Sequence, residues 1–194
     1  MNIYDFDGTI YNGDSCKDIV HYGLRKHPIL TIRALKKAKA LNKDYEKGYI
    51  QFERVKEEML SFLFQIEDKQ KFINDFVNSH IKKIKPWYLS RKNENDIIVS
   101  ASYEIWVGPF VKKLGLKYVV GTRVDADGKI LGLNCKGEEK VRRINALFQG
   151  ATIGCCYSDS SVDIPLLKMG KTAYVVEGNK LITYKDGYKF KNNK

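Results

Sequence analysis

The stretch that decides the fold lies at the start of the chain and runs Ile3-Tyr4-Asp5-Phe6-Asp7-Gly8-Thr9. A short apolar run leads into two aspartates one residue apart, as expected where a buried strand gives way to a loop. Two neighbouring carboxylates repel each other, so the pair needs a cation, or one member must keep a proton. The stretch therefore predicts a divalent-metal site, a nucleophile beside a proton donor, or both.

Two simpler interpretations of this stretch compete with a catalytic one. An Asp-x-Asp-Gly segment on its own is also a common surface turn. A calcium loop needs oxygen ligands at alternate positions and a glutamate about twelve residues after the first ligand. The first glutamate of the chain is Glu46, so the calcium interpretation fails. Whether the segment is only a turn depends on the residues that follow it.

Composition limits the class of protein. The chain has 194 residues, 43% of them hydrophobic and 12% aromatic, which is enough for one substantial domain or a core with an insertion. Its formal net charge of +11 favours an anionic partner, such as a phosphate ester, a nucleic acid or an acidic membrane surface. We expect no signal peptide, and no apolar run approaches the ~20 residues that span a bilayer.

The cysteines indicate the cellular compartment. They are Cys16, Cys135, Cys155 and Cys156, and no C-x-x-C pair occurs among them. A zinc ribbon or a thioredoxin-type motif is therefore not expected. Buried free thiols are typical of a reduced protein, so we predict a cytoplasmic location.

The middle of the chain, residues 12–90, is predicted to be entirely helical. Apolar residues recur at helical spacing in segments 15–27, 28–42, 49–65 and 68–85. Ser15 is expected to cap the first helix and Pro28 to open the second. In the second helix, the side expected to face the core carries Ile29, Ile32, Leu35 and Leu41. The opposite, basic side carries Arg33, Lys36, Lys37 and Lys39.

After residue 95 the pattern changes to alternating strands and helices. Strands are expected at 96–100, 118–124, 151–157 and 172–176, and helices at 102–114, 138–148 and 161–169. The turn at 125–128 predicts a β-hairpin with a return strand at 129–133. This alternation is typical of a parallel, Rossmann-like sheet flanked by helices. Since one strand precedes the helical block, we predict an α/β core of residues 1–11 and 91–194, with an all-helical insertion at 12–90.

Further polar residues follow other predicted strands. Ser100 comes where a strand ends and a helix begins, so it could hold an anion or simply cap the helix. Lys140 lies in the first turn of a later helix; it could equally be a surface lysine, and Lys136 is a rival candidate. Asp159 and Asp163 come at the start of another helix. They could be an N-cap and an acid that interacts favourably with the helix dipole, or a second pair of metal ligands.

These residues are expected to meet in space. In an open parallel sheet, ligands bind outside the carboxyl ends of the strands. Asp5, Ser100 and Asp159 occupy that end of three separate strands. A convergent set of acids, a serine and a lysine is hard to explain as surface turns, so we predict an active site at this edge of the sheet.

The whole chain resembles members of the haloacid dehalogenase superfamily. Residues 5–9 match its first motif, Ser100 the second, Lys140 the third, and Asp159 with Asp163 the fourth. The insertion is similar to the helical cap of the phosphoserine-phosphatase-like subgroup, which includes bacterial lipid-phosphate phosphatases. The resemblance implies a Mg²⁺-dependent phosphohydrolase that works through an aspartyl-phosphate intermediate.

The resemblance also implies roles for the three acids Asp5, Asp7 and Asp159. Asp5 would be the nucleophile, and the carboxylates of Asp5 and Asp159, with the backbone carbonyl of Asp7, would hold Mg²⁺. The Asp7 side chain would protonate the leaving oxygen and then activate water. True dehalogenases of this fold lack the second acid and need no metal, so Asp7 favours phosphoryl transfer.

The remaining roles concern phosphate and substrate. Ser100 and Lys140 would bind the phosphoryl group, and Asp163 would support the metal or Lys140. Asp14 lies where phosphoserine phosphatases carry a glutamate that binds the substrate amine, so it could do that or merely cap a helix. Met59, rather than Arg54, lies at the position of their carboxylate-binding arginine, which weakens the phosphoserine interpretation.

The natural substrate and acceptor stay open. The substrate could be a small or a lipid-linked phosphate ester, and the basic segment between Arg25 and Lys56 could dock on an anionic membrane or be a solvated face. The same residues would also serve a phosphotransferase. A non-catalytic protein that binds anions or nucleic acid is the alternative from another class. Nucleic acid is not expected, because no basic motif interleaved with aromatic residues occurs.

Overall fold

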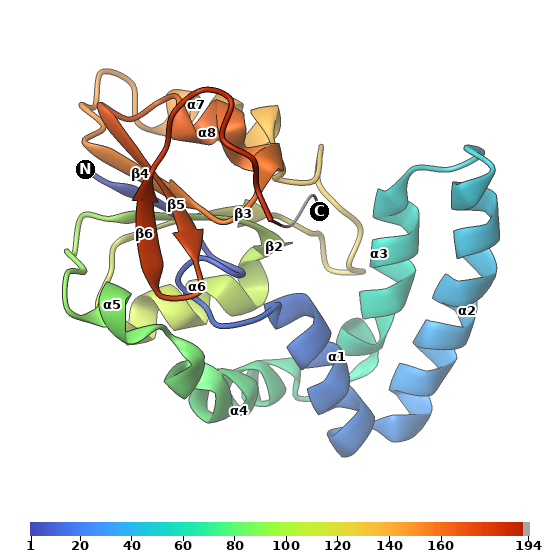
Figure 1. The fold of residues 1–194 in the computed structure, drawn as a ribbon. Coiled ribbons are helices and arrows are strands. Elements are labelled where there is room, and N and C mark those ends of the chain that lie inside the picture. The colour runs from blue at the N-terminus through green and yellow to red at the C-terminus, as the bar shows by residue number, and fades with distance from the viewer. Residues whose placement is uncertain (192–194) are drawn as a thin grey trace.

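A sheet of six strands organises the protein. The computed structural model describes residues 1–191. In the sheet the order is β3-β2-β1-β4-β5-β6, with β1 to β5 parallel and β6 antiparallel to β5 (Figure 1). The strands are β1 (Ile3–Asp5), β2 (Ile97–Tyr103), β3 (Tyr118–Thr122), β4 (Cys155–Ser158), β5 (Thr172–Glu177) and β6 (Lys180–Thr183). The predicted α/β, Rossmann-like core is confirmed.

Strand β1 lies in the middle of this sheet and is covered on both faces. Ile3 and Tyr4 are 0% and 1% exposed, and they belong to different apolar clusters. On the face of Tyr4, aromatic rings run across three strands. Tyr4 stacks on Tyr157 at 4.4 Å, and Tyr157 stacks on Tyr174 at 5.0 Å. Burial on both faces explains why the parallel strands are nearly continuous apolar runs.

Helices from the second half of the chain cover the two faces. Helix α6 (Glu104–Lys113) packs on the Tyr4 face through Trp106 and Phe110, both fully buried. Helices α7 (Glu138–Leu147) and α8 (Ile164–Leu167) pack on the opposite face through Ile144 and Leu166 (Figure 1). The sheet is therefore the middle layer between helices.

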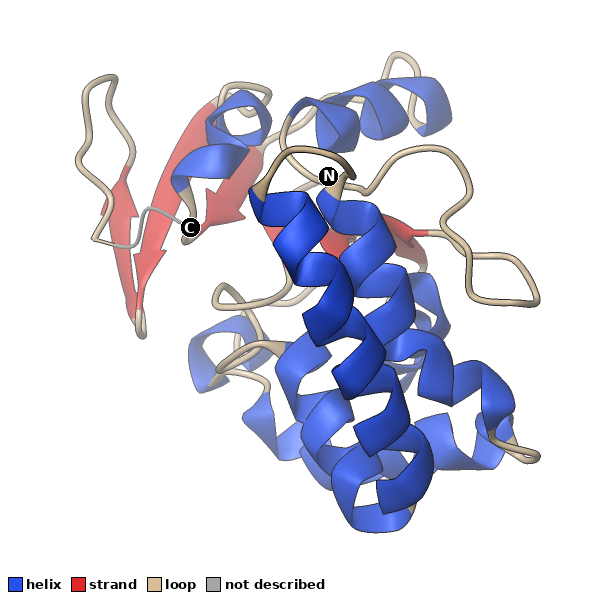
Figure 2. Cartoon of the chain, turned by 90° about the vertical axis from the view of Figure 1, so that its right-hand side faces the viewer, coloured by secondary structure: helices blue, strands red, loops and turns tan. Residues whose placement is uncertain are grey.

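The segment between β1 and β2 is a helical insert. It comprises α1 (Ser15–Lys26), α2 (Pro28–Glu46), α3 (Phe52–Leu60), α4 (Lys69–His80) and α5 (Pro86–Leu89), with 3-10 turns at Ser61–Gln65 and Ile81–Lys83. Helix α4 packs on the core, where the ring of Phe76 lies 5.9 Å from that of Phe110. Helices α2 and α3 form a hairpin that stands away from the sheet and faces the viewer in Figure 2.

Two strand predictions need correction. The turn at 125–128 forms, but the return strand at 129–133 is reduced to a single bridge between Val124 and Ile130. The Ile130 N–H points away from this bridge and donates to Glu57 of α3. The hairpin of the sheet is instead β5–β6. Strand β2 continues to Tyr103, so Ser100 lies inside it, and the register of β2 against β3 shifts between Val99 and Tyr103.

The predicted faces and cap of the insert also differ from the structure. Helix α2 buries the small residues Thr31, Ala34 and Ala38, whereas Ile29 and Ile32 are 66% and 44% exposed. The hairpin packs closely through small side chains, which leaves the larger apolar residues outside. The N-cap of α1 is Asp14, whose carboxylate accepts the Lys17 N–H at 3.1 Å; Ser15 is the first helical residue.

Two buried tyrosines differ in whether their hydroxyl groups are hydrogen-bonded, and this difference can be tested. Among the described residues the Tyr88 hydroxyl is buried without a hydrogen-bond partner, whereas the Tyr11 hydroxyl donates to Asp18 at 2.6 Å. Tyr88→Phe should raise the free energy of unfolding by about 1 kcal/mol, since a costly buried hydroxyl is removed. Tyr11→Phe should lower it by about 1–2 kcal/mol. Urea unfolding measures both, and a destabilised Tyr88→Phe would contradict the assignment.

Candidate active site

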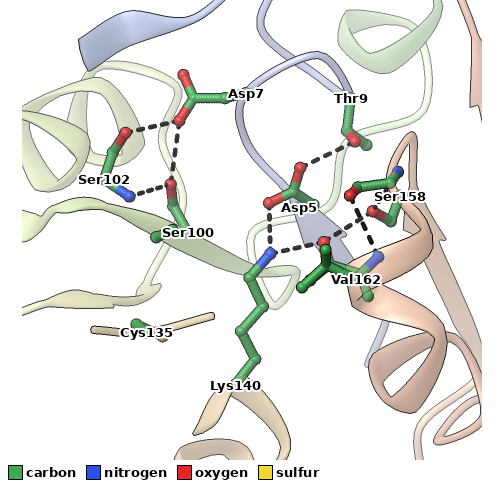
Figure 3. Close-up of polar contacts among 12 residues, drawn as sticks. Asp5, Asp7, Thr9, Ser100, Ser102, Cys135, Lys140, Ser158 and Val162 are labelled. Atoms are coloured by element: carbon green, nitrogen blue, oxygen red, sulfur yellow. Dashed lines mark hydrogen bonds and ion pairs between the residues drawn. The ribbon is translucent and has the colours of Figure 1, made fainter. Parts of the chain in front are cut away.

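The loop after β1 brings two carboxylates together. Gly8 has φ +79°, and a Cβ there would lie 2.2 Å from Oδ2 of Asp159, so this position requires glycine. The Thr9 hydroxyl lies 3.1 Å from Asp5 Oδ2 and 3.0 Å from Asp159 Oδ1. It also accepts the Asp159 N–H at 3.0 Å. The turn thus joins the ends of β1 and β4 (Figure 3).

A buried ammonium neutralises part of this acidic cluster. Lys140 Nζ donates to Asp5 Oδ1 at 2.6 Å and to Asp163 Oδ2 at 2.7 Å, and Asp163 also accepts the Ser158 hydroxyl at 2.8 Å. Burial raises the pKa of Asp5, and it works against the charge on Lys140. The charges of Asp163 and Asp5 outweigh that burial and raise the pKa of Lys140 above its usual range. We take Lys140 as charged, because two short bonds to carboxylates hold it.

The second acid of the first motif lies in a nest of hydroxyl and amide donors. Asp7 Oδ2 accepts the Ser102 hydroxyl at 2.7 Å and the Ser100 hydroxyl at 3.3 Å. Its Oδ1 accepts the Ser15 N–H at 2.5 Å. Burial raises the pKa of Asp7, and hydrogen bonds from Ser102 and Ser15 only partly offset it. Asp7 is therefore placed to keep or give a proton, apart from the Lys140 ion pair (Figure 3).

These groups face one cavity of about 390 Å³ between the sheet edge and the insert. Its acids are Asp5, Asp7, Asp14, Asp159 and Asp163, its lysines are Lys17, Lys56, Lys136 and Lys140, and its larger apolar residues are Cys16, Phe52, Met59 and Val162. A cavity with apolar walls and a few convergent charged groups is typical of a small-molecule site.

The structure brings most of the predicted site residues together. Asp5, Asp7, Asp159, Asp163 and Lys140 meet at the carboxyl edge of the sheet. Ser100 is fully buried behind Asp7, with its hydroxyl also accepting the Ser102 N–H at 2.9 Å. The rival Lys136 is exposed at the cavity wall, away from the ion pair. Asp14 caps α1 and also lines the cavity, so its substrate role stays a prediction.

Sequence reasoning missed three residues. Ser102 was detectable, because it lies two positions after Ser100 and alternate strand residues share a face. Lys56 and Lys85 were not, since nothing in their neighbourhoods distinguishes them from surface lysines, yet they are only 5% and 4% exposed. The ammonium of Lys85 donates to the carbonyl of Gly8 and so helps to fix the first motif.

The donor set fits a hard divalent cation. The buried carboxylates of Asp5 and Asp163 share the ammonium of Lys140, and the half-buried carboxylate of Asp159 lies beside Asp5 across the Thr9 hydroxyl. Within residues 1–191 no three acidic, histidine or cysteine side chains are already arranged as a metal cluster. Mg²⁺ commonly binds through only one or two carboxylates, with water completing its shell. Asp5 and Asp159, with the Asp7 carbonyl, could supply that partial set.

Comparison with known proteins identifies the family. The model of the haloacid dehalogenase-like hydrolases matches residues 3–168. The chain belongs to this family. The superfamily predicted from the motifs is thereby confirmed, and so is the prediction that the protein is an enzyme.

Individual relatives extend this result. Protein CicA of Caulobacter vibrioides is 30% identical over 179 residues, covering 84% of this chain and 80% of CicA. Histidinol-phosphatase of Neisseria meningitidis serogroup C is 21% identical over 191 residues, covering 87% and 86%. Phosphatases thus occur among the relatives.

Solved structures share the fold. A Bordetella pertussis Tohama I protein of unknown function matches with a TM-score of 0.71 and 21% identity, covering 89% of this chain and 87% of that one. A phosphoserine phosphohydrolase-like protein from Francisella tularensis matches with a TM-score of 0.53 and 19% identity, covering 89% and 86%. Both matches show that the fold is shared. No helix within residues 1–191 is long and apolar enough to cross a membrane.

Metal binding can be tested without turnover. Mg²⁺ at about a hundred times its dissociation constant should stabilise the folded chain by about 2.7 kcal/mol, seen as a rise in Tm. Asp159→Asn should lose this rise, whereas Asp127→Asn, at an exposed position of the turn at 125–128, should keep it. Equal rises in both variants would exclude Asp159 as a ligand.

Proposed function

We propose that the protein is a Mg²⁺-dependent phosphomonoester hydrolase that acts through a phosphorylated Asp5. The observation that carries the proposal is the position of Asp5. Its carboxylate ends the central strand and faces the cavity, with Lys140 on one oxygen and the Thr9 hydroxyl near the other. Membership in a hydrolase family with phosphatases among its relatives supports phosphoester chemistry.

The first step transfers the phosphoryl group to Asp5. A carboxylate oxygen of Asp5 forms a bond to phosphorus as the bond to the leaving oxygen breaks. Asp7 gives its proton to that oxygen, which departs as an alcohol. The transferred group spreads negative charge over its other oxygens, and Lys140 with the serine hydroxyls around Asp7 would stabilise that charge. Bound Mg²⁺ would supply further positive charge there.

The second step regenerates the enzyme. Asp7, now ionised, accepts a proton from water as the water oxygen bonds to phosphorus. The bond between phosphorus and Asp5 breaks, and inorganic phosphate leaves. The covalent intermediate divides one slow hydrolysis into two easier reactions. Asp163, which contacts the Lys140 ammonium, would keep that group oriented through both steps.

The helical insert would act as a cap over this site. We assign residues 12–90 to the cap and residues 1–11 and 91–194 to the core. Phe52 and Met59 of α3 line the cavity and would surround the part of the substrate beyond its phosphate. Asp14, on the same wall, would bind a positively charged or hydroxyl group of the substrate. The four cysteines are free thiols, which supports the cytoplasmic assignment.

The exposed surface of α2 supports contact with an anionic membrane and hence a lipid-linked ester as one substrate class. Ile29 and Ile32 are 66% and 44% exposed beside Arg33 and Lys36, and Tyr49 at the hairpin tip is 76% exposed. A helix that exposes both apolar and basic residues can lie in the interface of a bilayer. Aromatic residues also favour that region.

The catalytic roles of the two acids of the first motif can be separated by substitution. Asp5→Asn should abolish turnover of an aryl phosphate, because the nucleophile is lost while the fold remains. Asp7→Asn should lower kcat by ~10²–10⁴-fold, because the leaving oxygen loses its proton donor. Asp127→Asn is the matched control. If Asp5→Asn kept more than a few per cent of wild-type turnover, the nucleophile would have to be another residue.

Membrane contact has its own test. The wild type should co-sediment at low salt with vesicles of equimolar phosphatidylglycerol and phosphatidylcholine, and not with phosphatidylcholine alone. Lys36→Glu with Lys39→Glu should weaken this binding more than tenfold, since each lysine near an anionic bilayer contributes about 1 kcal/mol. The control Lys112→Glu with Lys185→Glu changes the net charge by the same amount away from α2. It should bind the anionic vesicles much more tightly than Lys36→Glu with Lys39→Glu does. Equal sedimentation with both vesicle types would end the membrane proposal.

A further inference from the structure

Helix α3 meets the core through charged side chains. Lys56 and Glu57 are 5% and 8% exposed, beside the buried apolar residues Val55 and Leu60. Separating an apolar contact exposes apolar surface to water, at a cost in free energy that grows with the area exposed. Hydrogen-bonded contacts exchange with water at a smaller net cost. The α3 contact is thus of a kind that can open and close.

Lys56 reaches from the insert into the core. Its ammonium donates to the Ala101 carbonyl at 2.6 Å and to Asn134 Oδ1 at 2.8 Å, and it lies 4.9 Å from the centre of the Tyr103 ring. These partners are a carbonyl, an amide oxygen and a ring rather than a carboxylate. Burial lowers the pKa of Lys56. A buried lysine with neutral partners is costly, so it points to a function beyond stability.

The Ala101 carbonyl lies in the segment that holds Asp7. Ala101 separates Ser100 from Ser102, whose hydroxyls both contact the Asp7 carboxylate. Here the register of β2 against β3 shifts, so the regular ladder does not fix these residues. Lys56 and the Thr122 hydroxyl, the latter at 2.7 Å, both donate to Ala101 and hold the segment in place.

Glu57 fastens the same helix to a second part of the core. Its carboxylate accepts the Ile130 N–H at 2.9 Å and lies 3.5 Å from Lys129 Nζ. Both belong to the loop between β3 and α7, which reaches across to α3 in Figure 1. Phe52 and Met59, on the same helix, line the cavity. Adjacent residues of α3 therefore fix the hairpin over the site.

We propose that Lys56 is a positioning residue that couples closure of the α2–α3 hairpin to the arrangement of the catalytic acid. When the hairpin is seated, the Lys56 ammonium holds Ala101, and Ala101 sets Ser100 and Ser102 against Asp7. When the hairpin lifts, the cavity opens and the Asp7 contacts loosen. The effect on turnover rests on the proposed function; the movement of the hairpin does not.

The cysteines allow this movement to be measured directly. Cys16 is half-buried on the cavity wall, and burial raises its pKa to about 12. Cys135 and Cys156 are fully buried in the core and report global unfolding. Cys155 is half-buried on β4 and serves as the reagent reference. Alkylation at pH 8, followed by peptide mass spectrometry, gives a rate for each thiol.

The test compares two lysines of the same hairpin. Lys56→Met removes the ammonium, whereas Lys37→Met removes one that is 72% exposed and pairs only distantly with Glu58 at 3.7 Å. Lys56→Met should raise the Cys16 rate severalfold, because opening the hairpin exposes the thiol to reagent and to water. The Lys56 charge itself lowers the pKa of Cys16, so its loss alone would slow labelling, and a faster rate reports exposure. Rates at Cys135 and Cys156 should not change. Lys37→Met should match the wild type.

Turnover of an aryl phosphate gives the second measurement. Lys56→Met should lower kcat at least roughly tenfold, because small misplacements of a catalytic group are costly. Lys56→Arg, which keeps cationic donors, should recover part of kcat and part of the Cys16 protection.

Several results would overturn the proposal. One is a Cys16 rate in Lys56→Met equal to that in Lys37→Met; another is selective exposure of Cys16 with kcat unchanged. An equal rise in the alkylation rates of all four cysteines in Lys56→Met would mean that Lys56 stabilises the whole fold and does not act on the hairpin. Asn134→Ala removes one of the two core acceptors of the Lys56 ammonium, so it should also raise the alkylation rate of Cys16 alone. No rise at Cys16 in this variant would contradict the proposal. Loss of the Asp5 mechanism would not alter the labelling rates, so the two proposals fail separately.

Discussion

The active site depends on one buried ammonium, that of Lys140, held between the carboxylates of Asp5 and Asp163. Without it, neighbouring acids at a shielded sheet edge would repel each other and take up protons. Helix α7 must therefore pack where its first turn delivers Lys140 to the end of β1. Asp5, Asp7, Asp159 and Asp163 gather at this edge, and this cluster of carboxylates is the physical reason to expect a divalent cation.

Topology explains how distant motifs meet around this ion pair. Strand β1 lies between β2 and β4, so residues after all three strands share one edge. The helical insert leaves the core directly after the first motif and returns before β2. Helix α3 is thereby carried over the cavity, where Lys56 contacts Ala101. The catalytic residues and the helices that cover the cavity are therefore joined by the chain itself as well as by side-chain contacts.

Much of this arrangement was predictable from sequence, because strand ends mark the active edge of a parallel sheet. Asp5 and Asp159 were predicted in this way, whereas Lys140, in the first turn of a helix, was chosen over Lys136 from the family resemblance. Lys56 escaped prediction because its burial depends on how the hairpin docks, which no local pattern encodes. For the same reason the apolar face of α2 was wrong: tertiary packing selected Thr31, Ala34 and Ala38 over Ile29 and Ile32. Hydrophobic periodicity predicts that a segment is helical, but it does not predict which face of the helix packs against the neighbouring helix.

The central claim is that Asp5 becomes phosphorylated during turnover. The most direct measurement is to quench the enzyme rapidly during turnover of an aryl phosphate, reduce it with borohydride and sequence its peptides by mass spectrometry. Borohydride converts an acyl phosphate of aspartate to homoserine, so position 5 should be converted only when substrate is present. Conversion at Asp7 or Asp159 instead, or none at position 5 under steady turnover, would contradict the account.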